Sequence, residues 1–266
     1  MIDVKALSKR FASPGLRRRD EAPVVAVDHV SFSVGAGEIL AVIGESGAGK
    51  STVGRMLLGL ERPDSGEVWV DGHELGAASE RALRRIRRRM SLVLQDPYQS
   101  LHPGWRVRTA VVEPLAVAGV SPPERSERAA LALEEVGLTP ATDFVNRFPH
   151  ELSGGQRQRV AFARALAGQP RVVVADEPTS MLDASLRRGV LDLITAMRDR
   201  LGTTFVVITH DLAAARYVAD RVVVMLNGQI VESGEIERVL DHPANEYTKM
   251  LLAASEGRLP EEASCG

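Results

Sequence analysis

The amino-acid sequence predicts an α/β fold in which a helical insertion interrupts a sheet domain. Apolar runs rich in valine and isoleucine occur at 171–175 and 204–208, with a helical pattern between them. Continuous runs of this kind between helices are typical of a parallel sheet that is buried on both faces. From residue 96 to about residue 167 the β-branched runs disappear, prolines cluster and helical periodicity appears, which predicts the insertion.

The part of the chain before the insertion has the pattern of short strands and two helices joined by turns. Turn-forming residues at 44–49 and 63–66 separate its elements. In order, we predict strands at 2–7, 27–34 and 38–43, a helix from 50 to about 60, a strand at 67–70, a basic helix at about 80–89 and a strand at 90–94.

Periodicity also predicts the sequence of helices and strands in the insertion and in the part that follows it. In sequence, we predict helices at 107–118 and 125–136, a strand at 171–175, a helix at about 184–200, strands at 204–208, 222–226 and 229–232, and a short tail after about 235. The expected segments are a core with a β subdomain (1–95), a helical subdomain (96–167), the second part of the core (168–240) and a short C-terminal tail (241–266).

The composition excludes several classes of protein. The 266 residues, 44% hydrophobic and 26% charged, suit one large or two small globular domains. No stretch approaches the roughly 18 apolar residues of a membrane span, and the N-terminus lacks a signal-peptide layout, so we expect a cytosolic protein. The single cysteine, Cys265, excludes a disulfide framework. The net charge of −2 gives no general reason to bind nucleic acid, although arginines cluster at 17–19 and 84–89.

Residues 44–51 fit a phosphate-binding loop between an apolar strand and a helix, a context that disfavours a simple glycine-rich turn. The glycines let backbone N–H groups curl around phosphates, and the helix N-terminus adds partial positive charge. Lys50 can neutralise the β and γ phosphates, and the Ser51 hydroxyl can ligate Mg²⁺. The residues assigned to the nucleotide are Gly44, Glu45, Ser46, Gly47, Ala48, Gly49, Lys50, Ser51 and Thr52.

Two carboxylates, Asp176 and Glu177, end the apolar run at 172–175. Carboxylates at the end of a buried strand are unfavourable unless they meet a cation. We therefore predict Asp176 as a partner of Mg²⁺ and Glu177 as the base that polarises an attacking water. Taken alone, such a pair would more often be ordinary surface charge.

A serine and two glycines open an amphipathic helix that continues through Leu166, and such a helix start forms another anion site. The residues concerned are Ser153, Gly154, Gly155 and Gln156, preceded by Leu152. This run, between a phosphate loop and a strand that ends in Asp-Glu, resembles the signature of the ABC ATPase family. The resemblance covers nearly the whole chain. It implies a P-loop NTPase (RecA-like) core with an N-terminal antiparallel β subdomain and an inserted helical subdomain, and an ATPase that uses ATP and Mg²⁺.

The resemblance implies further roles for single residues. Gln95 resembles the glutamine that senses Mg²⁺ and the attacking water, and Asp183 lies in a run (180–183) similar to the loop that crosses the dimer interface. His210 resembles the histidine that contacts the γ-phosphate, although a histidine at a strand end can equally be a cap. Phe11 is the best match to the aromatic that stacks on adenine, and it could instead be a core or loop aromatic.

The family resemblance also implies partners. In the family, the signature of one subunit faces the phosphate loop of another, so ATP would be held between two chains, identical or homologous. ATP binding would close this pair and hydrolysis would reopen it. The other implied partners are two integral membrane permease subunits and, indirectly, an extracytoplasmic solute-binding protein, at the cytoplasmic face of the cell membrane. No nucleic acid is expected.

Three strings, at 95–103, 147–151 and 242–248, resemble the peptide and nickel uptake branch of the family. The first follows Gln95, where the family docks its membrane subunits. We expect import only from this branch resemblance and from the absence of a fused membrane domain. The tail after Tyr247 is shorter than in many members of the branch, which leaves oligopeptides, dipeptides and nickel as candidate solutes.

Two other hypotheses compete with a transport motor. A soluble ABC ATPase could act on nucleic acid, ribosomes or a phosphonate-processing complex, with the arginines at 84–89 contacting phosphate. The sequence lacks the long coiled coil of DNA-repair members and the paired ATPase units of translation factors. A degenerate ATPase with a structural role conflicts with the presence of Ser153, Gly155, Glu177 and His210.

Overall fold

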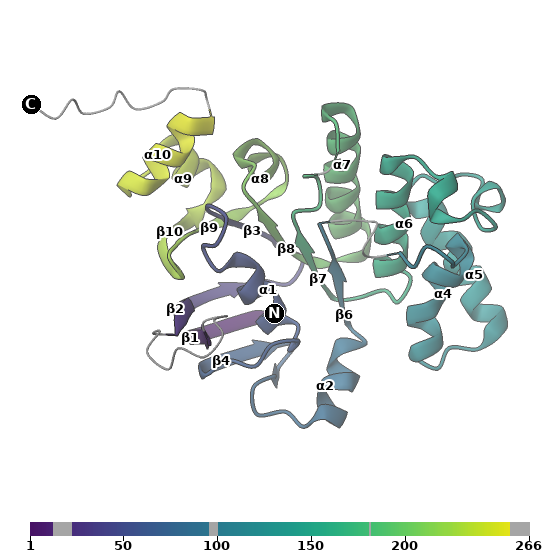
Figure 1. The fold of residues 1–266 in the computed structure, drawn as a ribbon, viewed down its shortest axis with the longest axis horizontal. Helices are drawn as coiled ribbons and strands as arrows, with labels where there is room; N and C mark the ends of the chain where they lie inside the picture. Colours follow the sequence, from purple (N-terminus) through teal and green to yellow (C-terminus); the bar gives the residue numbers. More distant parts are fainter. Residues whose placement is uncertain (13–22, 96–100, 181, 256–266) are drawn as a thin grey trace, which may run out of the picture. The chain divides into compact units, whose positions relative to one another are not determined.

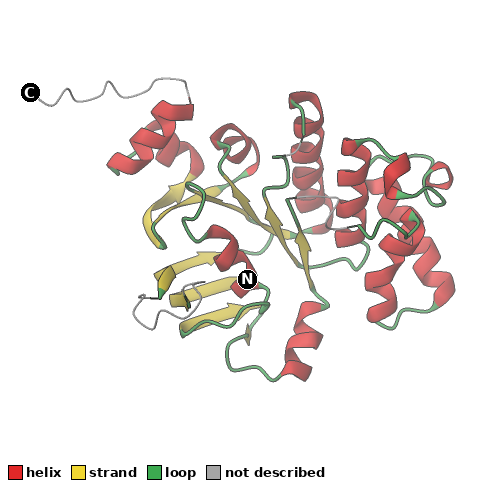
Figure 2. Ribbon diagram, viewed as in Figure 1, coloured by secondary structure: helices red, strands yellow, loops and turns green. Residues whose placement is uncertain are grey.

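The computed structural model describes residues 1–12, 23–95, 101–180 and 182–255. The described residues form both helices and strands (Figure 1, Figure 2). The chain forms two compact units. The first contains Met1–Val34, Ile39–Gly76 and the part from Ile208 onward, and the second contains Gly35–Glu38 and Ala77–Val207.

The first unit contains a four-stranded antiparallel sheet with the strand order β2-β1-β4-β5. Its strands are β1 (Ile2–Phe11), β2 (Val24–Val34), β4 (Ser65–Val70) and β5 (His73–Glu74). The pairing of β1 with β2 is irregular around Ala6 and His29, which have φ angles of 45° and 52°. Positive φ at an interrupted ladder is typical of a β-bulge, which increases the local twist of the sheet.

The same unit contains the elements around the glycine-rich loop. The buried strand β3 (Ile39–Ile43) runs parallel to β9 (Arg221–Leu226), which pairs antiparallel with β10 (Gln229–Glu235). Asn227 and Gly228, both with positive φ, form the tight turn of this hairpin. The helices of the unit are α1 (Lys50–Leu57), α8 (Leu212–Val218), α9 (Ile236–Asp241) and α10 (Glu246–Ser255).

The second unit combines parallel strands with a group of helices. β7 (Val172–Asp176) lies between β6 (Met90–Val93) and β8 (Thr204–Thr209), of which residues 204–207 belong to this unit. Three helices, α4 (Val107–Val117), α5 (Pro122–Glu135) and α6 (Gly154–Leu166), pack on one another (Figure 1). The remaining elements are α2 (Glu80–Arg87), α7 (Ala184–Leu201) and short 3₁₀ turns at Ala141–Asp143 and Pro149–Glu151.

Most of the predicted elements are confirmed within a few residues, although the first strand extends to Phe11. The predicted short tail after about 235 contains two helices, α9 and α10, that the sequence did not predict. No element was predicted over α8 either. These helices have six to ten residues, so each offers fewer than three turns in which periodicity can be recognised. Within the described residues, no helix has the length and apolar character needed to cross a membrane.

Candidate nucleotide-binding site

The predicted phosphate loop connects β3 to α1 in the first unit, and its glycines have conformations that other residues rarely adopt. The φ angles are 149° at Gly44, 84° at Gly47 and 94° at Gly49. A Cβ atom on Gly44 would lie 2.2 Å from the carbonyl oxygen of Met225, and one on Gly49 would lie 2.1 Å from that of Ala26. Glycine is therefore required at 44 and 49 both by backbone angle and by the neighbouring strands.

Lys50 is the first residue of α1, and it occupies the interior of the loop. Its side chain is 7% exposed, and its Nζ atom donates hydrogen bonds of 2.7 Å to the carbonyl oxygens of Gly44 and Glu45. Gly49, at the N-cap position, has no side chain to cap the helix. A buried ammonium beside a helix N-terminus without a side-chain cap is a suitable cradle for phosphate oxygens. Ser51 and Thr52 lie half-buried in the first turn of α1.

Two other predicted residues belong to the first unit. His210 is exposed and directly follows β8, in a turn where the N–H of Asp211 donates to Oγ1 of Thr209 at 3.0 Å. Asp211 caps α8 by accepting from the N–H of Ala214 at 3.0 Å. The capping role is therefore taken by Asp211. Phe11 ends β1 with an exposed ring, and Nζ of Lys9 lies 5.4 Å from the ring centroid.

In the second unit, Asp176 and Glu177 lie where β7 ends. Residues 172–175 are fully buried, whereas both carboxylate residues are half-buried. Glu177 has a φ of 50°, and its carbonyl oxygen accepts a hydrogen bond of 3.1 Å from the Ser180 hydroxyl. A non-glycine residue with positive φ is uncommon, and such residues cluster at functional sites.

The signature residues form the N-terminus of α6. The Ser153 hydroxyl accepts from the N–H of Gln156 at 3.2 Å, and the Gln156 side chain accepts from the N–H of Ser153 at 3.0 Å. This reciprocal pair is a capping box, which fixes where the helix begins. Gly154 has open space where a Cβ would lie, whereas a Cβ on Gly155 would lie 2.8 Å from the Leu186 side chain.

The remaining predicted residues also lie in the second unit. Asp183 caps α7, because its Oδ1 accepts from the N–H of Leu186 at 3.0 Å. Gln95 is exposed and lies just beyond the end of β6. Residues 96–100 of the string after Gln95, and Met181 of the run at 180–183, lie outside the described residues.

Comparison with known proteins identifies the family. A family model described as ABC transporter matches residues 27–180. The putative peptide import ATP-binding protein of Brucella ovis is 41% identical over 96% of this chain and 78% of its own length. This chain belongs to the ABC transporter family. The dipeptide transport ATP-binding protein DppF of Haemophilus influenzae is 44% identical to this ABC protein, over 87% of this chain and 71% of the relative.

Solved structures agree with this family and fold class. The ATP-binding cassette MJ0796, in a dimeric post-hydrolysis state bound to ADP and Pi, matches this ABC protein with a TM-score of 0.78 and 31% identity, over 89% of this chain and 99% of that one. The cbiO1 protein of Clostridium perfringens, part of the ABC transporter complex cbiONQ, matches with a TM-score of 0.78 and 27% identity. The match covers 91% of this chain and 90% of that one. The predicted P-loop ABC ATPase fold is confirmed, and the protein is an ATPase of this family.

Two residues near the motifs were missed by the sequence analysis of this ABC ATPase. Gln158 is 1% exposed, and its Nε2 donates a 2.8 Å hydrogen bond to the carbonyl oxygen of Pro178, next to Glu177. The hydroxyl of Tyr247 accepts a 3.0 Å hydrogen bond from the N–H of Glu45 in the phosphate loop. A buried tyrosine hydroxyl usually has a polar partner, but the sequence gives no sign of which one, since 202 positions separate the two residues.

Proposed function

We propose that this ABC ATPase drives uptake of peptides as one of two ATPase subunits bound to two membrane permease subunits at the cytoplasmic face of the cell membrane. The observation that carries the solute assignment is 41–44% identity with relatives named for peptide import and dipeptide transport. Dipeptides and oligopeptides are the first candidate solutes and nickel the next. A separate extracytoplasmic protein would select the solute.

The phosphate loop supports ATP as the energy source. Lys50 donates to two backbone carbonyl oxygens in the loop, and its ammonium, which has three N–H donors, would also bind the β and γ phosphate oxygens of ATP. The backbone N–H groups of residues 44–52 would surround the phosphates, apart from that of Glu45, which donates to Tyr247. Phe11, exposed at the end of β1, would stack on adenine, a contact that tolerates either phenylalanine or tyrosine.

Hydrolysis would use oxygen ligands and one base. The Ser51 hydroxyl, Asp176 and Gln95 are suitable donors for Mg²⁺, a hard cation that prefers oxygen and retains waters. Bound there, Mg²⁺ would neutralise charge on the phosphates. Glu177 would take a proton from the attacking water, and His210 would contact the γ-phosphate.

The signature of a second ATPase subunit would complete each nucleotide site. Ser153 and the open surface at Gly154 begin α6, which makes this helix N-terminus accessible to a γ-phosphate on a facing chain. Asp183, exposed at the start of α7, would lie at the same interface. ATP would therefore hold the pair closed, and loss of the γ-phosphate would release it.

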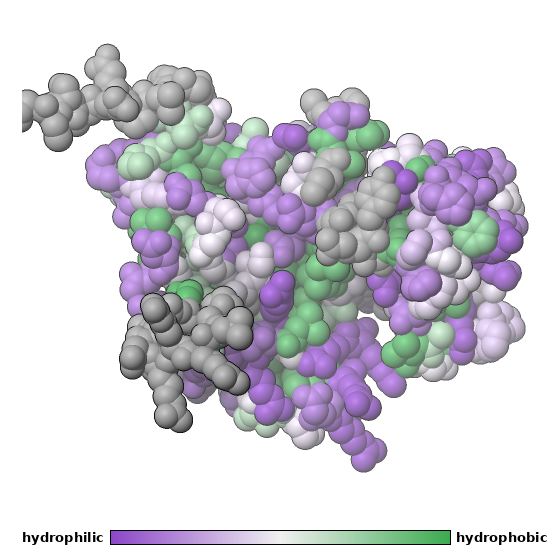
Figure 3. Space-filling view, viewed as in Figure 1, coloured by the Kyte–Doolittle hydropathy of each residue, from purple (hydrophilic) through white to green (hydrophobic). Residues whose placement is uncertain are grey.

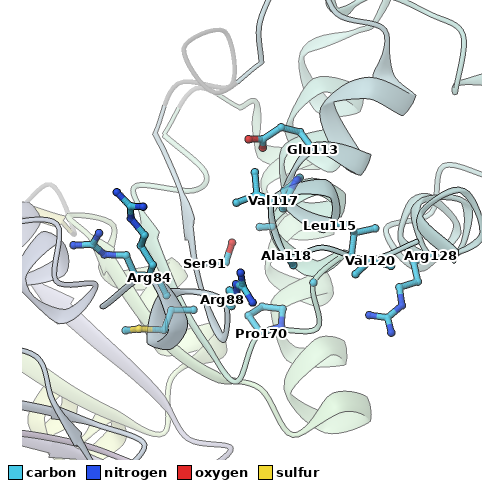
Figure 4. Close-up of a pocket in the computed structure, with 15 residues that line it drawn as sticks. Arg84, Arg88, Ser91, Glu113, Leu115, Val117, Ala118, Val120, Arg128 and Pro170 are labelled. Carbon is cyan, nitrogen blue, oxygen red and sulfur yellow. The ribbon is translucent and has the colours of Figure 1, made fainter. Parts of the chain in front are cut away.

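A pocket in the second unit suits a permease segment better than nucleic acid. The pocket has a volume of about 520 Å³ and is lined by α2, β6, α4 and the end of α6 (Figure 4). Leu115 and Val117 give it an apolar wall, while Arg84 on α2 and Arg88 at the end of that helix line it where the surface is hydrophilic (Figure 3). A smaller hollow continues along residues 90–94 toward Gln95. An amphipathic segment with acidic residues would match this combination.

The partner assignment can be tested by purifying the tagged protein from detergent-solubilised membranes and identifying the co-purifying proteins. Two peptide-type permeases would support the proposal, and nickel-type permeases would redirect the solute assignment. Recovery of only ribosomes, nucleic acid or a soluble enzyme complex would overturn it.

The assignment of Glu177 has its own test. Glu177→Gln should retain ATP binding and lose hydrolysis, so an ATP-dependent dimer should accumulate on size-exclusion chromatography. Glu134→Gln, which changes an exposed carboxylate on α5, is the matched control and should behave like the original protein. Hydrolysis by Glu177→Gln at the original rate, with no ATP-dependent dimer, would contradict the role.

A further inference from the structure

Helix α10 lies against the phosphate loop through one buried side chain. Tyr247, in the first turn of α10, is 8% exposed. Its hydroxyl oxygen accepts the hydrogen bond of 3.0 Å from the N–H of Glu45, and both residues belong to the first unit. Burial raises the pKa of this hydroxyl above its usual value, so it stays protonated at neutral pH.

The position of Tyr247 is fixed by the strand beneath it. The carboxylate of Glu232 on β10 accepts from the N–H groups of Ala244 and Asn245, at 2.7 and 3.1 Å. The side chain of Asn245 in turn accepts from the N–H of Tyr247 at 2.9 Å. The N–H groups of Ala244, Asn245 and Tyr247 are thus tied to β10 or to the turn itself.

On the loop side, Tyr247 and Lys50 hold the same peptide group. The N–H of Glu45 and the carbonyl oxygen of Gly44 belong to one planar peptide unit. Tyr247 binds the N–H at 3.0 Å, and Nζ of Lys50 donates to the carbonyl oxygen at 2.7 Å. Gly44 has a φ of 149°, and glycine has few steric restrictions on its backbone angles, so these two hydrogen bonds help to fix the orientation of this peptide unit.

We propose that Tyr247 is a positioning residue for ATP binding, whose hydroxyl keeps the Gly44–Glu45 peptide group oriented while Lys50 binds the phosphates. With ATP bound, Lys50 would share its three N–H donors between the loop carbonyls and the phosphates, so its hold on the Gly44 carbonyl would weaken. Tyr247 does not compete for phosphate, so its hydrogen bond persists as the loop fills. The string at 242–248, which resembles the peptide and nickel uptake branch of the family, therefore also contributes to the nucleotide site.

The test replaces only the hydroxyl. Tyr247→Phe keeps the ring in its packing and removes the acceptor for the N–H of Glu45. We expect the Kd for a fluorescent ATP analogue and the KM for ATP to rise about fivefold, equivalent to about 1 kcal/mol, with kcat changed less than twofold. Amide hydrogen exchange should accelerate in residues 44–46 and stay unchanged in α10. Tyr217→Phe, on the exposed tyrosine of α8, is the matched control and should change none of these.

Two results would overturn the proposal. The first is a Tyr247→Phe variant with the original Kd and the original exchange at residues 44–46. The second is a loss of ATP affinity in Tyr247→Leu, which also removes the ring, without any loss in Tyr247→Phe, because that pattern would assign the residue to packing of α10 alone.

Discussion

The glycines of the phosphate loop are not equivalent, and replacing them one at a time should reveal the difference. In Gly47→Ala the new Cβ meets nothing within 4 Å, so the only penalty is the φ of 84°. That penalty is about 1 kcal/mol, and the lower entropy of the unfolded alanine chain offsets about 0.5 kcal/mol of it. We expect a net loss of stability of about 0.5 kcal/mol.

Gly44→Ala has a backbone penalty at least as large, because a φ of 149° lies outside the left-handed region that residues with a Cβ can adopt, and it has an added collision. The new Cβ would lie 2.2 Å from the Met225 carbonyl oxygen, and Met225 is fully buried in β9. The strand cannot move by the necessary ångström without disturbing its pairing with β3 and β10, and overpacking of this kind costs about 1–3 kcal/mol. The expected difference between the two variants is therefore about 2 kcal/mol.

Urea unfolding followed by the fluorescence of Trp69, which lies in the same unit as the loop, measures this difference. Trp105, in the second unit, should be replaced by phenylalanine in all samples so that it does not contribute. With a slope of about 3 kcal/mol per M, the midpoint of Gly44→Ala should lie about 0.7 M below that of Gly47→Ala. Equal midpoints would refute the argument that the carbonyl of Met225 requires glycine at 44.

Three further predictions concern single side chains. Gln158→Met should lower unfolding stability by about 1–3 kcal/mol, because it removes the buried donor to the carbonyl of Pro178; an unchanged urea midpoint would contradict this. Ser153→Ala should cost about 1 kcal/mol through the lost cap of α6, measured in the same way, whereas Ser126→Ala, at an exposed position of α5, should have little effect. The pKa of Glu232 is lowered because the hydrogen bonds that it accepts from the N–H groups of Ala244 and Asn245, together with the nearby charge of Lys249, outweigh desolvation. Its stabilisation of the α10 anchor is therefore present above pH 4.5 and lost as the pH falls through the lowered pKa; Glu232→Gln should remove this acid-dependent opening of α10 in hydrogen exchange.

The chemistry of the phosphate loop could be predicted from the sequence because its determinants are contiguous. A strand, three glycines, Lys50 and Ser51 define a loop and a helix N-terminus without help from distant residues. The capping box of Ser153 and Gln156 is similarly local. The roles of Gln95, Phe11, Asp183 and His210 came from family resemblance, and they stay predictions.

The sequence by itself determined the family, the order of most strands and helices, and the positions of the motifs. The tertiary structure alone decided why Gly44 and Gly49 tolerate no side chain, that Gln158 supports the loop beside Glu177, and that Tyr247 holds the phosphate loop. The physical reason is the separation along the chain between the residues that determine each feature. Backbone angles and helix caps depend on residues within a few positions, whereas a carbonyl from a neighbouring strand or a hydroxyl from 202 positions away comes into contact only when the chain has folded.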